Sequence, residues 1–506
     1  MLLAFAVGPP AGAAGAEPEP DLDAATIPRL QSLMDRGKLT SVRLTNAYLD
    51  RIRRLDGRIH AVLTTDPTAV AQAEASDRRR ERGHTRGPLD GIPVLLKDNI
   101  DTKHLATTVG SRAMRTPPDR DATLVRRLRD AGAVIIGKAN LSEWANFRST
   151  SATSGWSGVG LQTNNPYVLD RNPCGSSSGS GAGVAASLAQ VAVGTETDGS
   201  IVCPAGANGV VGHKPSLGLV SRAGIAPISA EQDTAGPMAR HVVDAAITLS
   251  VLQGRDRGDP ATAQIPAGQP DDYARLLRPD ALRGARIGVY RQAGIDPDVD
   301  RIVEESVATL RAKGATVIDV DVPYREQFAA AELPALLTEF ARDLPKYLAH
   351  RRDVPRTLAE LVEFDKQDPV ELSRFGQELF EQALVAPAPD DPAYLMQRAT
   401  ATSLAKRSID ETMAAHDLDA IMSPTNGPAW KTTYGEGDDG FLLESSGPAA
   451  VAGYPNVAVP AGYAGELPIG VSFFAGRWQD ARVLAFAAAY EAANPVRHAP
   501  RLVPTA

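Results

Sequence analysis

Apolar residues recur at helical spacing near the start of the chain. Leu44, Tyr48 and Ile52 lie four positions apart, which places them on one face of a helix. Leu55 continues the same face three positions later. A threonine or serine at position 40 or 41 can cap this helix, and Gly57 follows it. The pattern predicts an amphipathic helix that ends before Gly57 and covers a core.

The apolar run at residues 91–96 has a different character, because it is bounded by glycine and proline and ends abruptly in Lys97 and Asp98. Continuous apolar residues between such boundaries are typical of a strand that is buried on both faces. Buried lysines are rare unless they are paired or functional. The run therefore predicts a strand that carries Lys97 to a functional position. Asp98 points the opposite way in an extended strand, so we expect a structural role for it.

Helical and strand patterns then alternate along most of the chain. This alternation predicts an α/β fold, with helices packed on a central sheet. Residues 325–415 differ, because interrupted helical patterns dominate there. We expect them to form a mostly helical variable cap on one domain that spans residues 22–500. The other expected helices lie at residues 124–128, 184–189, 299–312 and 483–492, and the expected strands at 133–136, 191–193, 287–290, 316–322, 420–424, 457–459 and 470–474.

The composition restricts the class of protein. The 506 residues are 43 % hydrophobic and 23 % charged, as in a globular protein with a large core. The formal net charge of -8 and the pI near 5.6 argue against a general nucleic-acid binder, which needs clustered Lys and Arg. Beyond the N-terminal segment, no run approaches the roughly 18 apolar residues of a membrane-spanning helix. We expect neither nucleic acid nor membrane among the partners.

The N-terminal 16 residues resemble a targeting segment. They open with an apolar run and end in Ala14, Gly15 and Ala16, a small-residue pattern typical of a signal-peptide cleavage site. The positively charged opening of a signal peptide is missing. We expect a secreted or periplasmic protein. The alternative is a disordered leader on a cytoplasmic protein.

The chain has two cysteines, Cys174 and Cys203. Two cysteines cannot form a disulfide framework, and their spacing is not that of a zinc site. We expect both to pack as small apolar side chains, with a redox role as the alternative. Because the sequence shows no cluster of metal ligands, we expect no metal and no other cofactor.

Two segments, residues 172–181 and 194–201, are too rich in glycine and serine to be ordinary packing elements. Each adjoins a predicted buried element, and α/β enzymes place their sites at strand ends. A serine nucleophile needs an adjacent base, and a lysine such as Lys97 can serve when burial keeps its amine neutral. Gly199 permits a turn that directs the backbone N–H groups before Ser200 at one oxyanion. Two flexible loops are the alternative.

In these motifs the chain resembles the amidase signature family, over most of residues 40–490. The resemblance implies a single α/β domain with a mixed, twisted central sheet flanked by helices. It rests on Gly91-Ile92-Pro93 before Lys97-Asp98, Asn140-Leu141-Ser142-Glu143-Trp144, Gly175-Ser176-Ser177, Gly194-Thr195 before Gly199-Ser200, Asp233-Thr234-Ala235-Gly236-Pro237-Met238 and Gly453-Tyr454-Pro455.

The resemblance also implies a Ser, cis-Ser, Lys triad. Carried over residue by residue, Ser200 is the nucleophile and Lys97 is the base. Ser176 is the bridging serine, which follows a cis peptide bond from Gly175.

The same carry-over implies an oxyanion hole built from backbone N–H groups. Thr197, Asp198 and Gly199 contribute to it, with Ser200 as a fourth donor. No metal takes part in this chemistry.

Two positions depart from the usual family pattern. This chain has Asp198 where the family usually has glycine, and Val202 where the family usually has arginine or another polar residue. Segments 172–179 and 196–204 look most similar to bacterial peptide amidases, which remove the C-terminal amide of peptides and release ammonia. We therefore expect a small-molecule or peptide amide as the partner, and a monomer or homodimer. A broad-specificity aliphatic or aryl amidase, or the amidase subunit of a tRNA-dependent amidotransferase, is the alternative.

Two other motif interpretations compete with this one. Residues 175–179 match the G-x-S-x-G elbow of α/β-hydrolases, which would make Ser177 the nucleophile and leave Lys97 without a role. Residues 179–183 partly match a dinucleotide-binding loop, but without its full spacing, and we expect them to let a helix pack closely. The histidines that the elbow mechanism could use are His213, His241, His350, His416 and His498.

Overall fold

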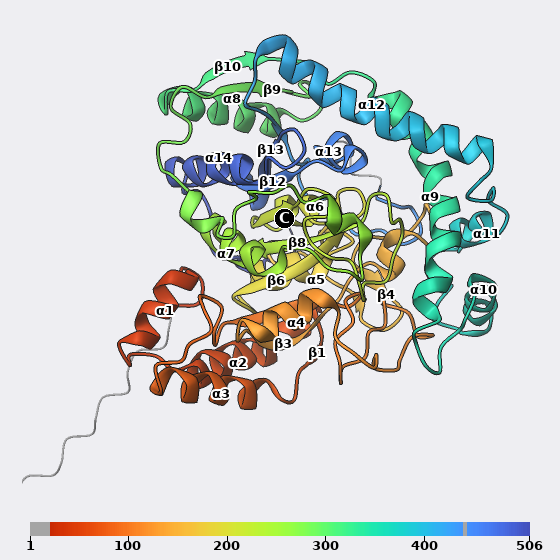
Figure 1. Cartoon of the computed structure of the whole chain (residues 1–506), viewed down its shortest axis with the longest axis horizontal. Helices are drawn as coiled ribbons and strands as arrows, with labels where there is room; N and C mark the ends of the chain where they lie inside the picture. The colour runs from red at the N-terminus through yellow and green to blue at the C-terminus, as the bar shows by residue number, and fades with distance from the viewer. Residues whose placement is uncertain (1–20, 439–442, 506) are drawn as a thin grey trace, which may run out of the picture.

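The computed structural model describes residues 21–438 and 443–505 (Figure 1). The predicted signal peptide or leader at residues 1–16 lies outside the described residues and stays a prediction. Within the described part, no helix is both long enough and apolar enough to cross a membrane.

Eleven strands of the described chain form one mixed sheet. Three neighbours in its first half, β3 (Val134–Ala139), β2 (Pro93–Lys97) and β6 (Val191–Glu196), run parallel, whereas β8 (Thr234–Ala239) runs antiparallel to β6. The predicted α/β fold with a mixed, twisted sheet is confirmed. In spatial order the strands are β1 (Val62–Thr65), β3 (Val134–Ala139), β2 (Pro93–Lys97), β6 (Val191–Glu196), β8 (Thr234–Ala239), β7 (Val211–Lys214), β12 (Asn456–Ala464), β13 (Leu467–Phe474), β11 (Ala420–Pro424), β9 (Arg286–Val289) and β10 (Thr316–Asp319).

Helices surround this sheet, and a separate two-stranded ribbon pairs β4 (Trp156–Ser157) with β5 (Leu161–Gln162). Outside residues 325–416 the helices are α1 (Ile27–Asp35), α2 (Ser41–Ile59), α3 (Ala69–Glu81), α4 (Thr123–Asp130), α5 (Ser178–Ala185), α6 (Val202–Ala207), α7 (Val242–Leu252), α8 (Pro297–Ala312), α13 (Ser446–Ala452) and α14 (Asp480–Ala493).

The predicted amphipathic helix exists as α2, and Thr40 caps it by accepting a hydrogen bond from the Arg43 N–H. The predicted end before Gly57 is wrong, because α2 continues to Ile59. One exposed glycine in the last turn costs only about 1 kcal/mol, and the extension buries Ile59 completely. Burial therefore outweighs the local stop signal.

The helix predicted at residues 184–189 is displaced, since α5 begins at Ser178 inside the Gly/Ser-rich segment. Its glycines allow close packing, as expected for residues 179–183. A Cβ on Gly179 would contact the Ala61 carbonyl oxygen and would lie 2.6 Å from the Asn140 carbonyl oxygen. Gly179 therefore permits close contact between backbones, and the segment remains helical.

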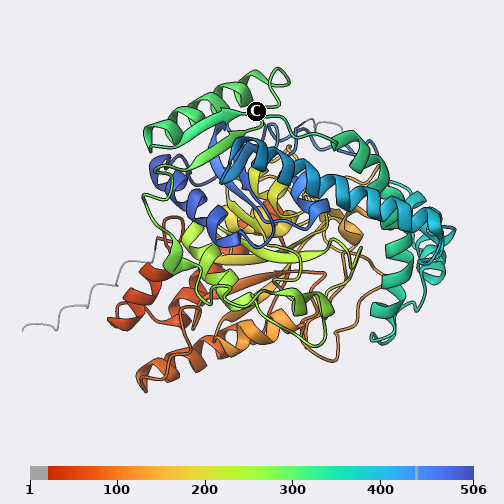
Figure 2. The same ribbon diagram turned by 45° about the horizontal axis from the view of Figure 1, so that its top comes forward.

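Four helices occupy residues 325–416, in a chain segment without strands. Figures 1 and 2 show the long helix α12 crossing near α9, with α10 and α11 on the outer side of α9. One face of this group borders the cavity described below. The four are α9 (Arg325–Leu348), α10 (Leu358–Gln367), α11 (Glu378–Leu384) and α12 (Pro392–His416).

Candidate active site

Lys97 is the last residue of β2 and has no exposed surface. Its Nζ donates hydrogen bonds to the Ser176 hydroxyl oxygen at 2.7 Å and to the Thr195 carbonyl oxygen at 3.1 Å. Burial lowers the pKa of Lys97 to about 7, although the charges of Glu196 and Asp233 oppose the shift. The amine is therefore substantially neutral near pH 7 and can accept a proton.

Ser176 lies between the end of β2 and helix α5, and it is fully buried. The Gly175–Ser176 peptide bond is cis. The Ser176 carbonyl oxygen accepts a hydrogen bond from the Ser142 N–H at 3.0 Å. The structure thus brings two of the three predicted triad residues, Lys97 and Ser176, into direct contact.

Ser200 lies between β6 and α6 and is 8 % exposed. Its carbonyl oxygen accepts a hydrogen bond from the Ser177 N–H at 3.1 Å, which joins the two Gly/Ser-rich segments. The hydrogen bonds of the described residues do not include one between the Ser200 and Ser176 hydroxyls. Ser200 instead lines a cavity together with Gly175 and Gly199.

The turn before Ser200 is organised by a residue that the sequence analysis missed. The Glu196 carboxylate accepts the N–H groups of Ile201 at 2.7 Å and Val202 at 3.0 Å. Burial raises the pKa of Glu196. The charge of Lys214 and the hydrogen bonds from these two N–H groups and from the Gly199 N–H lower it, but by less. The sequence motif could have indicated this role, because Glu196 is a long acidic residue among mostly small residues.

Asp233 is a second acidic residue beside the site, and it is half-buried. Its carboxylate accepts hydrogen bonds from the Thr197 hydroxyl at 2.6 Å and from the Ile228 and Ser229 N–H groups. Burial raises its pKa to about 6, against the effect of these donors. Asp233 thereby anchors Thr197, one of the predicted oxyanion donors.

The cavity beside Ser200 has a volume of about 380 Å³. Helix α9 contributes Glu332 to its wall, and Glu444 lies nearby. Burial raises the pKa of Glu332 to about 7. The other wall residues are Ala145, Asn146, Phe147, Ser154, Cys174, Gly175, Asp198, Gly199, Ser200, Cys203, Ala329, Leu333, Leu336, Asp438 and Ser446.

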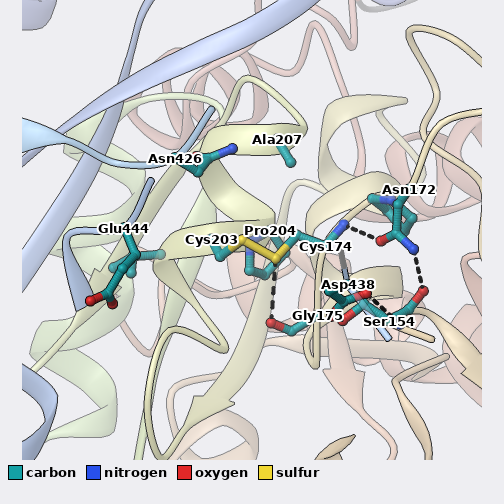
Figure 3. The surroundings of a disulfide bond; sticks show 12 residues. Ser154, Asn172, Cys174, Gly175, Cys203, Pro204, Ala207, Asn426, Asp438 and Glu444 are labelled. Atoms are coloured by element: carbon teal, nitrogen blue, oxygen red, sulfur yellow. Dashed lines mark hydrogen bonds between the residues drawn. A yellow bond between two sulfur atoms is a disulfide. The ribbon is translucent and has the colours of Figure 1, made fainter. Parts of the chain in front are cut away.

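Cys174 and Cys203 form a disulfide, so the expectation of two unlinked apolar side chains is wrong (Figure 3). They lie 29 residues apart in sequence, yet their Cα atoms are 5.9 Å apart. The physical reason is that each lies close to a predicted catalytic serine, Ser176 or Ser200. Contact between the two serine segments brings the cysteines together.

The nucleophile-elbow alternative does not fit the structure. Ser177 is fully buried, and its hydroxyl donates to the Thr195 carbonyl oxygen at 3.0 Å. His213 faces Asp480 at 3.2 Å in a buried pair, not Ser177.

Asp98, for which we expect a structural role, has a buried cationic partner. It forms a buried ion pair with Lys138 at 3.0 Å and accepts a hydrogen bond from the Thr108 N–H. Among the described residues, no group of three or more His, Cys, Asp or Glu side chains could hold a metal ion.

Comparisons with known proteins identify the family. The family model for amidases matches residues 43–484. The crystal structure of the native peptide amidase of Stenotrophomonas maltophilia superposes with a TM-score of 0.91 and 48% sequence identity, covering 94% of this chain and 98% of that chain.

Curated sequences point to the same family. A probable amidase of Arabidopsis thaliana is 39% identical over 495 residues, covering 95% of this chain and 92% of the relative. One subunit of the glutamyl-tRNA(Gln) amidotransferase of Moorella thermoacetica is 34% identical over 483 residues, covering 92% of this chain and 96% of the relative. The chain belongs to the amidase family and is a hydrolase of carboxylic amides.

Proposed function

We propose that this enzyme removes the C-terminal amide of peptides through Lys97, Ser176 and Ser200, and releases ammonia. The observation that carries the proposal is the 2.7 Å hydrogen bond between the buried Lys97 amine and Ser176, whose neighbour Gly175 lines a cavity together with Ser200. The 48% identity to a peptide amidase supports the choice of substrate class.

The first half of the reaction forms an acyl-enzyme. Neutral Lys97 accepts a proton from Ser176, which takes the proton of Ser200 as the Ser200 oxygen attacks the amide carbon. The tetrahedral intermediate collapses when its C–N bond breaks, and the proton returns from Lys97 through Ser176 to the leaving nitrogen. Ammonia departs, and the acyl group remains on Ser200.

Water completes the cycle by the same route. It gives a proton through Ser176 to Lys97, attacks the ester carbon and releases the peptide acid as Ser200 regains its proton. Hydroxyl contacts in a free enzyme often tighten only when substrate binds, so the reactive Ser200 contact with Ser176 forms in the complex.

The oxyanion of both intermediates would be stabilised by backbone N–H groups of the turn before Ser200. Ile201 and Val202 are unsuitable donors, because Glu196 already accepts their N–H groups. The Gly199 N–H also faces Glu196. Thr197 and Asp198 are therefore the principal donors in this proposal.

Export to an oxidising compartment is part of the proposal. Disulfides persist in secreted and periplasmic proteins and are rare in the cytosol of mesophiles. The Cys174–Cys203 bond therefore agrees with the targeting segment expected at residues 1–16.

The test is ammonia release from a panel of amides. We expect turnover of an N-acetylated peptide amide to exceed that of free amino acid amides, aliphatic amides and anilides. Comparable rates on aliphatic amides or anilides would identify a broad-specificity amidase. Activity confined to glutamine with a charged tRNA and partner subunits would identify a component of an amidotransferase, and either result would overturn the proposed substrate class.

A further inference from the structure

The disulfide joins the two segments that carry the catalytic serines. Cys174 stands two positions before Ser176, and Cys203 stands three positions after Ser200, in the first turn of α6. Figure 3 shows the sulfur–sulfur bond passing from the Cys174–Gly175 segment to the helix that holds Pro204 and Ala207. A covalent bond thus links the neighbourhoods of the two hydroxyls that must exchange a proton.

Non-covalent contacts also join the same segments, and one of them holds the Ser200 backbone. The Asn208 side-chain amide donates to the Pro173 and Pro204 carbonyl oxygens, each at 2.7 Å. The Ser177 N–H donates to the Ser200 carbonyl oxygen. Because these bonds remain when the disulfide is cleaved, we expect the reduced chain to stay folded with looser positioning of the serines.

The disulfide also borders the cavity in which the substrate acyl group would lie. Cys174 is 4 % exposed and Cys203 is 3 % exposed, and both residues line that cavity. Elsewhere Ala207 and Trp430 pack against them. A small reductant can therefore reach the bond through the cavity, whereas a bound substrate would block the approach.

We propose that the Cys174–Cys203 disulfide is a positioning element of the active site, and that its reduction through the substrate cavity reversibly lowers turnover. The inference rests on the proposed triad of Lys97, Ser176 and Ser200. It adds a redox requirement to amide hydrolysis.

The switching step is thiol–disulfide exchange with a dithiol such as dithiothreitol. The protein S–S bond breaks, each cysteine gains one hydrogen as a thiol, and the two dithiothreitol thiols are oxidised to a cyclic disulfide. Oxidised dithiothreitol or oxidised glutathione reverses the step.

Counting free thiols reports the state of the disulfide directly, because Cys174 and Cys203 are the only two cysteines of the chain. We would first establish ammonia release from a peptide amide by the oxidised enzyme, which tests the proposed function separately. The oxidised protein should then show no thiol reactive with Ellman's reagent after denaturation, and the reduced protein should show two. The circular dichroism spectrum should be unchanged by reduction.

Reduction should lower kcat by about tenfold or more, because a displacement of catalytic groups by about 1 Å can cost about a hundredfold. It should change KM less. The acid limb of the pH–rate profile should move to higher pH, since loosening the segment over Lys97 lets water reach its amine. Reoxidation should restore both kcat and the profile.

The Cys174→Ser/Cys203→Ser double variant should behave like the reduced wild-type enzyme and should not respond to dithiothreitol. In the inactive Ser200→Ala variant, a saturating N-acetylated peptide amide should slow the appearance of thiols. Two free thiols in the protein before reduction, or a reduced enzyme with unchanged kcat and pH profile, would overturn the proposal. Equal reduction rates with and without the peptide amide would overturn access through the cavity.

Discussion

The Lys97 amine lies between the Ser176 hydroxyl and the Thr195 carbonyl oxygen, with no exposed surface. In water a lysine of ordinary pKa is protonated at neutral pH and cannot act as a base. Burial lowers this pKa to about 7. At the scale of single residues, desolvation therefore supplies the neutral amine that the proposed base requires.

The first prediction concerns the pH dependence that follows from this shift. Only the deprotonated amine can accept a proton, so kcat/KM should rise as the pH increases through about 7 and fall below it. Initial rates of ammonia release across the pH range test this. A profile that stays flat down to about pH 4 would contradict the role of Lys97.

The second prediction concerns removal of the base. Lys97→Ala should lower kcat by roughly 10³-fold, within the range that general-base catalysis supplies. Lys97→Arg is the matched control, because it restores a long side chain but stays protonated, and it should be as inactive as the alanine variant. Substantial activity in the arginine variant would show that no neutral base is needed at this position.

Glu196 allows a third prediction with a defined sign. Its charge raises the pKa of Lys97 against the larger effect of burial. Glu196→Gln removes that charge, so the acid limb of kcat/KM should move to lower pH. The variant also weakens the bonds to the Ile201 and Val202 N–H groups, and its maximal rate should fall. A limb that moves to higher pH would be inconsistent with the electrostatic role of Glu196.

At the scale of elements, β2 and β6 run side by side and in parallel, and their carboxyl ends deliver Lys97 and the turn of Ser200. Helix α5 packs against both strands and follows Ser176, which lies beside Lys97. Its glycines allow this close packing, since a Cβ on Gly183 would lie 3.2 Å from the Leu95 side chain of β2 and Gly179 lies against the backbone of Ala61 and Asn140.

The fourth prediction compares two helical glycines. Gly179→Ala should destabilise the protein by about 2 kcal/mol or more, because the new methyl group would overlap backbone atoms that cannot move aside. Gly57→Ala should stabilise it by about 0.5–1 kcal/mol, since Gly57 is helical and has nothing within 4 Å of a Cβ. Urea unfolding of both variants measures the difference. Equal effects would refute the packing argument for α5.

At the scale of the whole molecule, the fold class and Lys97 could be predicted because each leaves a local signal. Alternating helix and strand periods specify an α/β sheet, and a lysine that ends an apolar strand is conspicuous. Ser176 and Ser200 carry no such individual signal among their serine neighbours, and only the family resemblance singled them out. The resemblance also supplied the cis bond at Ser176, which the structure contains.

The parts that escaped prediction depend on contacts between distant segments. The Cys174–Cys203 pairing follows from the approach of two loops, which sequence spacing does not reveal. The role of Glu196 depends on the N–H directions of a turn. The continuation of α2 past Gly57 depends on burial of Ile59 in the tertiary structure.

The central claim is that Ser200 becomes acylated after Lys97 draws its proton through Ser176. The most direct measurement is intact-protein mass spectrometry, followed by peptide mapping, after acid quench of the enzyme during turnover of an N-acetylated peptide amide. We predict an added mass equal to the substrate minus ammonia on the fragment that contains Ser200, and none in Ser200→Ala. An adduct on Ser177, or unimpaired hydrolysis by the Ser200→Ala variant, would contradict the account.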